Sequence, residues 1–344
     1  MMKQYTSLDR MMAALNFERP DRVPVFLNNA LASSRAIGLK VGQILRDPER
    51  FAEALVTSYK TYGYDGVRVS CDVTVEVEAM GGKVAYPEDA GGSLVEHPIK
   101  TPADFDRLKM PNPLTDGRMP LMQKVVSLAR SQVGDNTFIA ATVQGPMNVA
   151  AQLVGVPNAM MMIFKNPEFL EKLLDFAVEV SFAYGSAMYK AGANCITFGE
   201  ASCSVSMMGP AHYRRFVKPR HERLMTAFRE AGHPYQTMHI CGKLDPILLD
   251  VAETGIRSAD IDAPVDMAAA REKLGSRLAM IGNVSPVELM EAPAERVTEL
   301  AKGVLDGKEG LGLVLGAGCN MSPLTPPENI RAMVEAARDY GVYE

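Results

Sequence analysis

The segment Tyr235-Gln-Thr-Met-His-Ile-Cys-Gly242 has the pattern of a short buried strand that ends in a His-x-Cys pair. A second apolar segment, Gly312-Leu-Val-Leu-Gly-Ala-Gly-Cys319, ends in a lone cysteine. Side chains two residues apart on a strand point to the same side, so His239 and Cys241 can face one ion. If the two strands are neighbours in one sheet, Cys319 can reach the same ion.

Similar short apolar runs recur along the chain and alternate with longer helical patterns, which is typical of βα units in a parallel sheet. The eight expected strands cover residues 22–27, 66–70, 137–143, 194–198, 235–240, 257–261, 278–282 and 311–316. The expected helices cover residues 47–62, 120–133, 167–191, 210–231, 245–252, 267–273, 286–305 and 327–339, with an additional N-terminal helix at 6–16.

Eight such alternations without a Pro/Gly/Ser-rich linker predict an α/β fold, a single (β/α)8 TIM barrel with an N-terminal helical extension. We expect residues 1–344 to form this one domain. A doubly wound open sheet is the alternative, but no GxGxxG sequence follows any expected strand. The segment 81–113 fits the alternation least and predicts a long loop after the second strand, of a kind that often has a function.

Composition narrows the functional classes. The 344 residues include 47% apolar and 22% charged side chains, with a net charge of −5, which is ordinary for a packed protein. Lysines and arginines form no cluster like a phosphate-binding stripe, so we expect no nucleic-acid partner. No apolar stretch reaches the roughly 18 residues of a membrane-spanning helix, and the first residues lack a secretory pattern, so a cytoplasmic location is expected. The five cysteines are an odd number spread over the chain, which predicts reduced thiols.

Two thiolates and one imidazole suit Zn²⁺, and three protein ligands leave a fourth position open, as in catalytic zinc sites. We therefore expect His239, Cys241 and Cys319 to bind zinc. Glu200 ends the expected fourth strand and would lie at the same rim of the barrel. It is a candidate fourth ligand that substrate displaces, a partner that orients His239, or a catalytic general acid/base.

Active sites of barrels lie where strands end, so other polar and apolar side chains near strand ends are candidates for substrate contact. These candidates are Asn28, Asp72, Gln144, Met147, Met207, Asp260 and Asn283. The remaining cysteines and histidines have no ligand-like spacing. We expect Cys195 to lie in the core, Cys203 to be a spare thiol, and the other histidines to have surface or packing roles, namely His97, His212, His221 and His233.

Several motifs together resemble the uroporphyrinogen decarboxylase superfamily, and within it the zinc-dependent, corrinoid-linked methyltransferase branch. They are Asp21-Arg-Val-Pro-Val25, Thr74-Val-Glu-Val-Glu-Ala-Met-Gly81, Gly145-Pro-Met-Asn-Val-Ala150, Met238-His-Ile-Cys-Gly242, Ile281-Gly-Asn-Val-Ser-Pro286 and Gly318-Cys-Asn-Met-Ser-Pro-Leu-Thr-Pro-Pro-Glu-Asn-Ile330. The resemblance spans nearly the whole chain. It implies a (β/α)8 barrel whose zinc ligands map onto His239, Cys241 and Cys319.

The resemblance also implies a methyl transfer in which cobalt takes part. No histidine lies in the Asp-x-His-x-x-Gly sequence that marks corrinoid-binding proteins, so we expect a separate corrinoid (cobalamin) protein as partner, with the loop 81–113 as a contact. Decarboxylases of the superfamily have an arginine-rich segment after the first strand. Here that segment is Phe26-Leu-Asn-Asn-Ala-Leu-Ala-Ser-Ser-Arg35, which disfavours a decarboxylase. A non-catalytic zinc-binding barrel is the other alternative.

Two substrates fit this branch. The enzyme would either take the methyl group of a methoxylated aromatic compound, as an O-demethylase does, or methylate a thiol such as coenzyme M. Methionines near the third and fourth strand ends, Met147, Met207 and Met208, favour the aromatic substrate, whereas the likeness at 74–81 and 318–334 favours the thiol. The sequence places the aromatic substrate slightly ahead.

Overall fold

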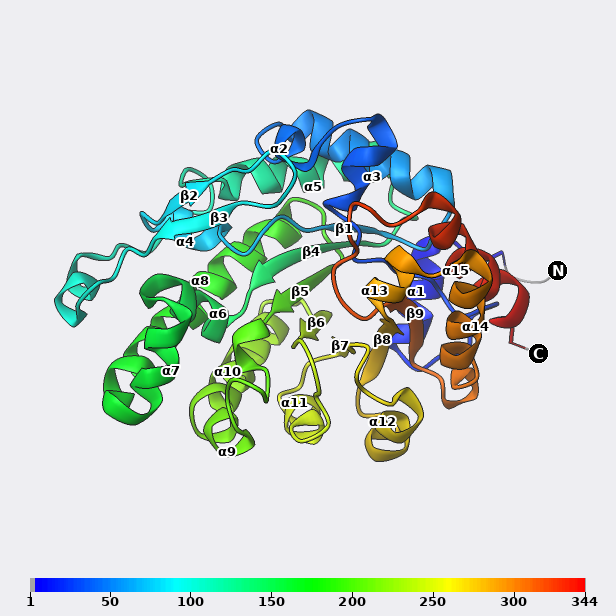
Figure 1. The fold of residues 1–344 in the computed structure, drawn as a ribbon. Coiled ribbons are helices and arrows are strands. Elements are labelled where there is room, and N and C mark those ends of the chain that lie inside the picture. The colour runs from blue at the N-terminus through cyan, green and yellow to red at the C-terminus, as the bar shows by residue number, and fades with distance from the viewer. Residues whose placement is uncertain (1–3, 344) are drawn as a thin grey trace.

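Seven parallel strands form a curved sheet in the centre of the computed structural model, which describes residues 4–343 (Figure 1). Their order is β1-β4-β5-β6-β7-β8-β9, so each strand pairs with the next strand of the sheet along the chain. The predicted parallel α/β barrel architecture is confirmed. The predicted extent of one domain, 1–344, stays a prediction, and residues 1–3 and 344 lie outside the described part. The strands are β1 (Val67–Val69), β4 (Ile139–Gln144), β5 (Cys195–Gly199), β6 (Gln236–His239), β7 (Ser258–Asp260), β8 (Ala279–Val284) and β9 (Leu313–Ala317).

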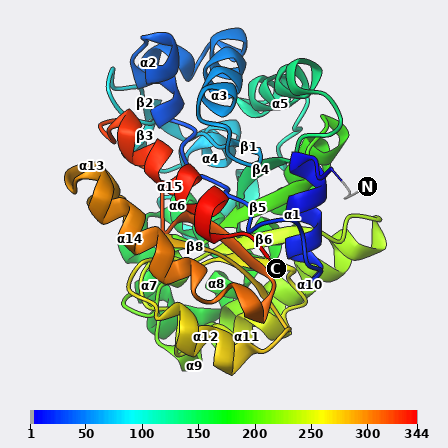
Figure 2. The same cartoon turned by 90° about the vertical axis from the view of Figure 1, so that its right-hand side faces the viewer.

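Helices form a ring around these strands, and α1 lies across one end of the barrel beside both termini (Figure 2). The longer helices are α1 (Ser7–Leu15), α3 (Pro48–Tyr62), α5 (Met119–Val133), α6 (Pro146–Val154), α7 (Val156–Lys165), α8 (Pro167–Lys190), α10 (Lys218–Glu230), α12 (Met267–Leu274), α14 (Ala294–Leu305) and α15 (Pro327–Tyr340). The shorter ones are α2 (Val41–Ile44), α4 (Val75–Ala79), α9 (Pro210–His212), α11 (Leu248–Glu253) and α13 (Pro286–Glu291).

The predicted first strand at 22–27 is wrong as a regular strand. Val25 forms a single parallel bridge with Leu315 of β9, and its carbonyl accepts a hydrogen bond from Asp65 N just before β1. The segment therefore lies between the two edge strands and completes the circle. Pro24 has no N–H to donate, which interrupts the hydrogen-bond ladder that a longer strand would need.

Two predicted helices and one predicted loop differ in detail. The predicted helix 286–305 is divided into α13 and α14, because Pro293 prevents the residue before it from continuing a helix. The predicted helix 210–231 begins with α9 and a π-helical turn at Tyr213–Val217 before α10. Part of the predicted loop 81–113 forms an antiparallel hairpin of β2 (Lys83–Ala85) and β3 (Ser93–Glu96).

Helices α6 and α7, between β4 and α8, were not predicted. Pro146, Gly155 and Pro157 interrupt this part of the sequence, so no single long helical pattern runs through it. Together the two helices are long and apolar enough for a membrane span, but they bend by 101° at Gly155. No single helix within residues 4–343 has the length and apolar character to cross a membrane.

The inside of the barrel changes from apolar to polar along the strands. Near α1 the inward side chains are apolar and fully buried, and include Phe26, Phe138 and Ile281. The next layers toward the carboxyl ends carry polar side chains such as Thr142 and Thr197. A parallel barrel is normally filled by branched apolar side chains, so the polar half marks the part of the interior that is available for chemistry.

The Asp65 carboxylate holds the seam of the barrel together. It accepts hydrogen bonds from Val25 N at 2.9 Å, from Arg22 Nη1 at 2.6 Å and from Arg10 Nη1 at 3.1 Å. Asp65 is buried, so these contacts join α1, the closing segment and the start of β1 in a region that water reaches poorly. Removing this carboxylate would leave the largely buried Arg22 guanidinium without its carboxylate partner and Arg10 with Asp21 alone.

We predict that Asp65→Ala lowers the free energy of unfolding by about 3 kcal/mol, the usual cost of breaking a buried ion pair on one side. Urea unfolding followed by circular dichroism measures this loss. Glu299→Gln is the matched control, because Glu299 pairs with Arg296 on the surface, where both side chains are at least half exposed. The control is expected to change stability by less than about 0.5 kcal/mol. Equal effects of the two substitutions would contradict the role of Asp65.

Glu76 of α4 is buried directly behind the end of β4. Its Oε1 atom accepts a hydrogen bond from Gln144 N at 2.7 Å, whereas Oε2 has no hydrogen-bond partner within residues 4–343. Burial raises the pKa of this carboxyl group from its usual 4.5 to about 7. Glu76 is therefore protonated in the folded protein over a pH range in which the unfolded chain has already lost the proton.

The raised pKa of Glu76 predicts a pH-dependent stability. The folded state binds one more proton than the unfolded state between pH 4.5 and about 7, so stability from this group is present below pH 4.5 and is lost as pH rises through 7. Glu76→Gln keeps the oxygen acceptor but cannot ionise. We expect this variant to be about 3 kcal/mol more stable than the parent protein at pH 8 and similar to it at pH 4.5. Urea unfolding at the two pH values tests this prediction. The same difference in free energy of unfolding between the variant and the parent protein at both pH values would contradict it.

Candidate active site

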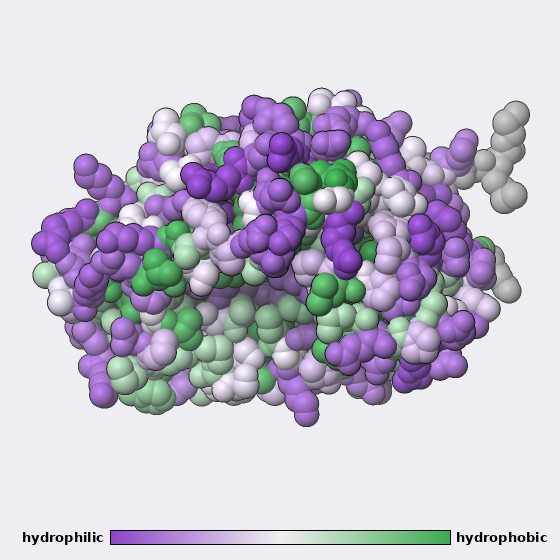
Figure 3. Space-filling model, turned by 45° about the horizontal axis from the view of Figure 1, so that its top comes forward, coloured by the Kyte–Doolittle hydropathy of each residue, from purple (hydrophilic) through white to green (hydrophobic). Residues whose placement is uncertain are grey.

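A cavity of about 350 Å³ opens where the strands of the barrel end. Its lining comes from the strands and the loops that follow them, and includes three of the predicted metal ligands, His239, Cys241 and Cys319. The surface is hollowed near the middle of the face shown in Figure 3, with apolar side chains along the lower border of the hollow. A cavity of this size is within the range of small-molecule sites.

The predicted ligand trio meets at the rim of this cavity. His239 is the last residue of β6, Cys241 follows two residues later, and Cys319 follows β9. The Nε2 atom of His239 lies 3.3 Å from the sulfur of Cys241 and 3.3 Å from the sulfur of Cys319. All three ligand atoms lie within 4.8 Å of one another. The long gap in sequence is therefore closed by the circular sheet.

These distances fit a tetrahedral metal ion. Zinc bonds of about 2.0–2.3 Å require nitrogen and sulfur ligands roughly 3.5 Å apart, close to the separations in the trio. On the other side of the ring, His239 Nδ1 lies 3.4 Å from the backbone oxygen of Asp260, a contact that would orient the imidazole. The trio offers two soft sulfur ligands and one imidazole and leaves the cavity side free.

The two thiols differ in acidity because they share one proton. The hydrogen bond between them lowers the pKa of Cys319 to about 4 and raises the pKa of Cys241. His239 adds to the stabilisation of the Cys319 thiolate. For His239 itself, burial lowers the pKa, but the hydrogen bond and charge of Cys319 outweigh it, and the net shift is upward. Metal binding at this trio would release the remaining protons.

The Glu200 carboxylate has partners of its own. It accepts hydrogen bonds from Met147 N at 3.0 Å and Asn148 N at 2.9 Å, at the N-terminus of α6, where a negative charge is favourable. His221 Nε2 lies 2.8 Å from it, and Cys203, His221 and Glu200 form a second group of neighbouring ligand-type side chains. The structure does not bring Glu200 to the other three predicted ligands, although Glu200 does line the cavity.

His221 and Cys203 have closer links to the site than the sequence indicated. His221 is fully buried and connects Glu200 to Tyr213, whose hydroxyl oxygen lies 3.2 Å from His221 Nδ1. The expectation of a packing role for His221 is therefore incomplete. Twenty-one positions separate His221 from Glu200, and no local pattern marks this pair.

Three of the predicted substrate contacts, Asn28, Asp72 and Gln144, line the cavity. The Asp72 carboxylate forms an ion pair of 2.8 Å with Arg118. Gln144 accepts a hydrogen bond from Asn148 Nδ2 at 2.9 Å. The Asp72 and Gln144 side chains are thus held by neighbours and have fixed positions at the cavity wall.

The other four predicted contacts do not line the cavity. Met147 is fully buried in the hydrophobic core, and Met207 is 44% exposed on the surface. Asp260 forms a buried ion pair with Arg68, and Asn283 donates its amide hydrogens to the backbone oxygens of Asp262 and Val265. Sequence position near a strand end did not specify which way these side chains point.

Residues that sequence reasoning missed form much of the inner wall. Arg68, Thr142 and Thr197 line the cavity from β1, β4 and β5. Each of the three lies two residues before another lining residue, namely Ser70, Gln144 or Gly199. Side chains two residues apart on a strand face the same side, and this period could have identified them from the sequence.

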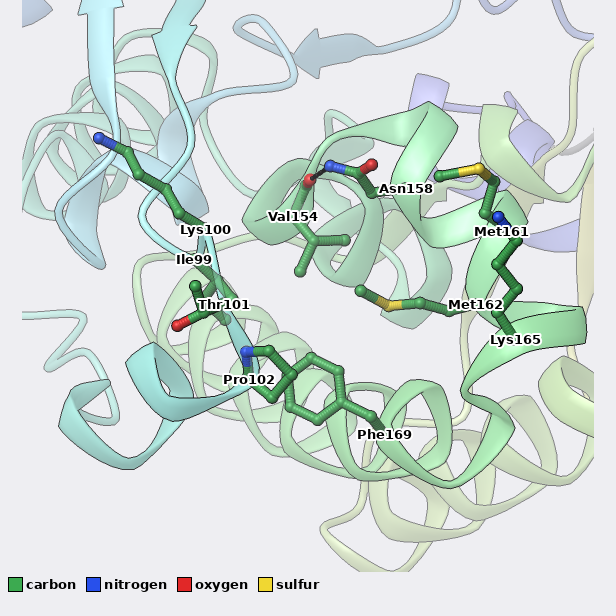
Figure 4. A pocket seen from close by; sticks show the side chains of 10 residues that line it. All are labelled: Ile99, Lys100, Thr101, Pro102, Val154, Asn158, Met161, Met162, Lys165 and Phe169. Carbon is green, nitrogen blue, oxygen red and sulfur yellow. Dashed lines mark hydrogen bonds between the residues drawn. The ribbon is translucent and has the colours of Figure 1, made fainter.

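A smaller cavity of about 210 Å³ lies away from the ligand trio, between the segment 99–102 and helices α6 to α8 (Figure 4). Its wall is largely apolar and includes Met161, Met162 and Phe169. Asn158 closes one side and donates to Val154 O at 2.8 Å. This cavity lacks the cluster of titratable side chains that marks the barrel cavity, so the barrel cavity is the candidate active site.

Comparisons with known proteins agree with the predicted resemblance. The chain is 29% identical over 346 residues to the methylcobamide:CoM methyltransferase MtaA of Methanosarcina barkeri, covering 98% of this chain and 99% of that one. It is 27% identical over 328 residues to the uroporphyrinogen decarboxylase of Geobacter sulfurreducens, covering 92% and 94%. The solved structure of a methyltransferase from Methanosarcina mazei matches with a TM-score of 0.91 and 30% identity over 98% of this chain and 99% of that one.

The predicted relationship is therefore confirmed, and corrinoid-dependent methyl transfer, the enzyme class predicted from the sequence, is the class that the methyltransferase relatives carry in their names. A family model described as uroporphyrinogen decarboxylase (URO-D) matches residues 6–340. Because that match spans nearly the whole sequence, this chain belongs to the uroporphyrinogen decarboxylase (URO-D) family.

Proposed function

We propose that this chain is a zinc-dependent methyltransferase that exchanges a methyl group between a small substrate and the cobalt of a separate corrinoid protein. The observation that carries the proposal is the trio of His239 Nε2 and the sulfurs of Cys241 and Cys319, which lies at the open rim of the barrel cavity. Three ligands with a free side facing a substrate cavity are the arrangement of a catalytic zinc. The names of the methyltransferase relatives support the reaction class.

When bound at the trio, zinc would supply a Lewis acid that lowers the pKa of a thiol or polarises a methyl ether oxygen. The chain itself provides the ligands and their orientation. Asp260 holds the His239 ring through its backbone oxygen, and Glu200 fixes the start of α6 against the cavity wall. These contacts keep the trio and the wall in fixed relative positions, which is what a reaction between two bound groups requires.

A corrinoid protein remains the proposed partner. The relatives' names specify a methylcobamide, in which the methyl group is carried on a corrinoid. We propose that the segment 81–113 contacts this partner, since it presents exposed apolar side chains, Val95 and Met110 among them. A cytoplasmic location follows from this assignment as part of the proposal.

A decarboxylase function is less well supported than methyl transfer. The only arginine of the segment 26–35, Arg35, donates to the backbone oxygen of Pro323 at 2.6 Å and does not line the cavity. Arg68 is the one guanidinium group in the cavity lining, and Asp260 already neutralises it. Among the described residues, the cavity lining therefore offers no unpaired cation to hold a substrate with several carboxylates.

The residues that line the cavity do not favour a methoxylated aromatic substrate over a thiol. The methionines that favoured the aromatic compound do not line the cavity: Met147 and Met208 are buried in the core and Met207 lies at the surface. We keep both substrates in the proposal.

The first test is metal content. We predict about one zinc per chain in the purified protein, lost in Cys241→Ala and in Cys319→Ala, because three protein ligands are needed for a stable catalytic site. Cys195→Ala and Cys203→Ala are the controls. Cys195 lies in the barrel core and Cys203 lies in the Glu200 group. Metal analysis by plasma mass spectrometry measures the content. Zinc-free protein, or loss of zinc in the Cys203 control alone, would contradict the assignment.

The second test is methyl exchange itself. With Co(I) cobalamin and 2-methoxyphenol, the methyl group should move from the ether oxygen to cobalt. The remaining phenolate then takes up a proton and is released as catechol. With methylcobalamin and a thiol, the thiolate should take the methyl group and leave Co(I). The visible spectrum of cobalt should change in at least one mixture and stay constant with Cys319→Ala. If neither mixture changes, the proposed function is wrong.

A further inference from the structure

The inner wall of the barrel cavity carries four buried polar atoms that lack a hydrogen-bond partner within residues 4–343. All four belong to residues that line the cavity: Asn28 Oδ1, Arg68 Nε, Thr142 Oγ1 and Thr197 Oγ1. Arg68 and Thr197 are each only 2% exposed. Buried polar atoms normally have partners, so a group of four around one cavity points to a polar ligand.

Three of these atoms, on Arg68, Thr142 and Thr197, lie deeper in the barrel than the ligand trio. Thr142 and Thr197 are direct neighbours on β4 and β5, and Gly199, two residues after Thr197, is the register partner of His239. Two residues along a strand correspond to roughly 6–7 Å. Below them the Arg68 guanidinium stacks on the ring of Phe26, 4.6 Å from its centre, where the apolar core begins. Arg68, Thr142 and Thr197 therefore lie beneath the proposed zinc, and together with Asn28 on the same cavity wall they are called the polar floor.

The charges of the lining are already balanced. Among the lining residues the charged groups besides the trio are Arg68, Asp72 and Glu200. Arg68 is paired with Asp260 and Asp72 with Arg118, while Glu200 is held by the start of α6 and lies against His221. An anionic substrate would lose its hydration without gaining an unpaired cation, which is costly in a buried site.

The floor offers both kinds of hydrogen-bonding partner. Arg68 Nε donates, Asn28 Oδ1 accepts, and the hydroxyl groups of Thr142 and Thr197 do either. A hydroxyl group, which donates and accepts, matches this set better than a carboxylate or sulfonate, which only accepts. The floor would therefore bind the end of the substrate that lies away from the reacting atom.

We propose that the cavity selects small uncharged substrates whose hydroxyl group binds the floor formed by Asn28, Arg68, Thr142 and Thr197. The thiol or methoxy group of such a substrate then lies toward the ligand trio. This inference rests on the proposed methyl transfer and adds the substrate class to it: an uncharged hydroxyl-bearing thiol or methoxy compound, and no sulfonate or carboxylate.

Two pairs of compounds test the class by isothermal titration calorimetry of the purified holoenzyme. 2-Mercaptoethanol and 2-mercaptoethanesulfonate share the thiol and differ in the tail, and 2-methoxyphenol and 4-hydroxy-3-methoxybenzoate differ by one carboxylate. In each pair that shows binding, we expect the dissociation constant of the uncharged compound to be at least tenfold lower than that of the charged compound. Equal or tighter binding of the charged member overturns the inference and leaves methyl transfer unaffected. Absence of binding by all four compounds also overturns it.

Two threonine variants separate the floor from a general structural role. Thr197→Val should weaken binding of the uncharged compound about three- to tenfold while leaving the melting temperature unchanged or higher, since its hydroxyl has no partner among residues 4–343. Thr237→Val is the matched control on the neighbouring strand, and its hydroxyl lies 2.6 Å from Ser258 Oγ. The control should lower the melting temperature and keep the affinity. The reverse outcome, stability lost and affinity kept in Thr197→Val, overturns the assignment of the floor.

Discussion

The buried ion pair between Arg68 and Asp260 crosses the inside of the barrel from β1 to β7, and both ends of the candidate site depend on it. The Arg68 guanidinium lies on Phe26 and forms part of the polar floor. Asp260 contacts the His239 ring through its backbone oxygen. A buried charge pair of this kind cannot lose one partner without a large cost, so it fixes the distance between floor and trio.

This arrangement divides the cavity into two chemical regions. At the rim, soft sulfur and nitrogen ligands meet around one point, with the proton between the two cysteines ready to leave when a metal binds. About two residues deeper, hydroxyl, amide and guanidinium groups surround the closed end. A small molecule that spans the two regions is held at one end and reacts at the other, which leaves the outer face of the cavity free for a methyl-carrying partner.

Seven strands could be predicted from the sequence because short apolar runs alternate with helical patterns. The meeting of His239, Cys241 and Cys319 could be predicted because side chains two residues apart on a strand face the same side and parallel strands end at one rim. The segment 22–27 was misread because its apolar pattern resembles a strand while Pro24 interrupts the ladder. The partners of Glu200 could not be predicted because they are backbone N–H groups of a helix, α6, that was not expected from the sequence. His221 belongs to the site through a contact with a distant segment, which no local pattern encodes, whereas Arg68 and Thr197 follow the period of two along their strands.

The central claim is that two cysteines and one histidine hold a catalytic zinc at the rim of this barrel. X-ray absorption at the zinc edge of the purified protein tests it most directly. The account predicts two sulfur neighbours at about 2.3 Å and nitrogen or oxygen neighbours at about 2.0–2.2 Å. A zinc shell without sulfur, or the same shell in Cys241→Ala and Cys319→Ala as in the parent protein, would contradict the account.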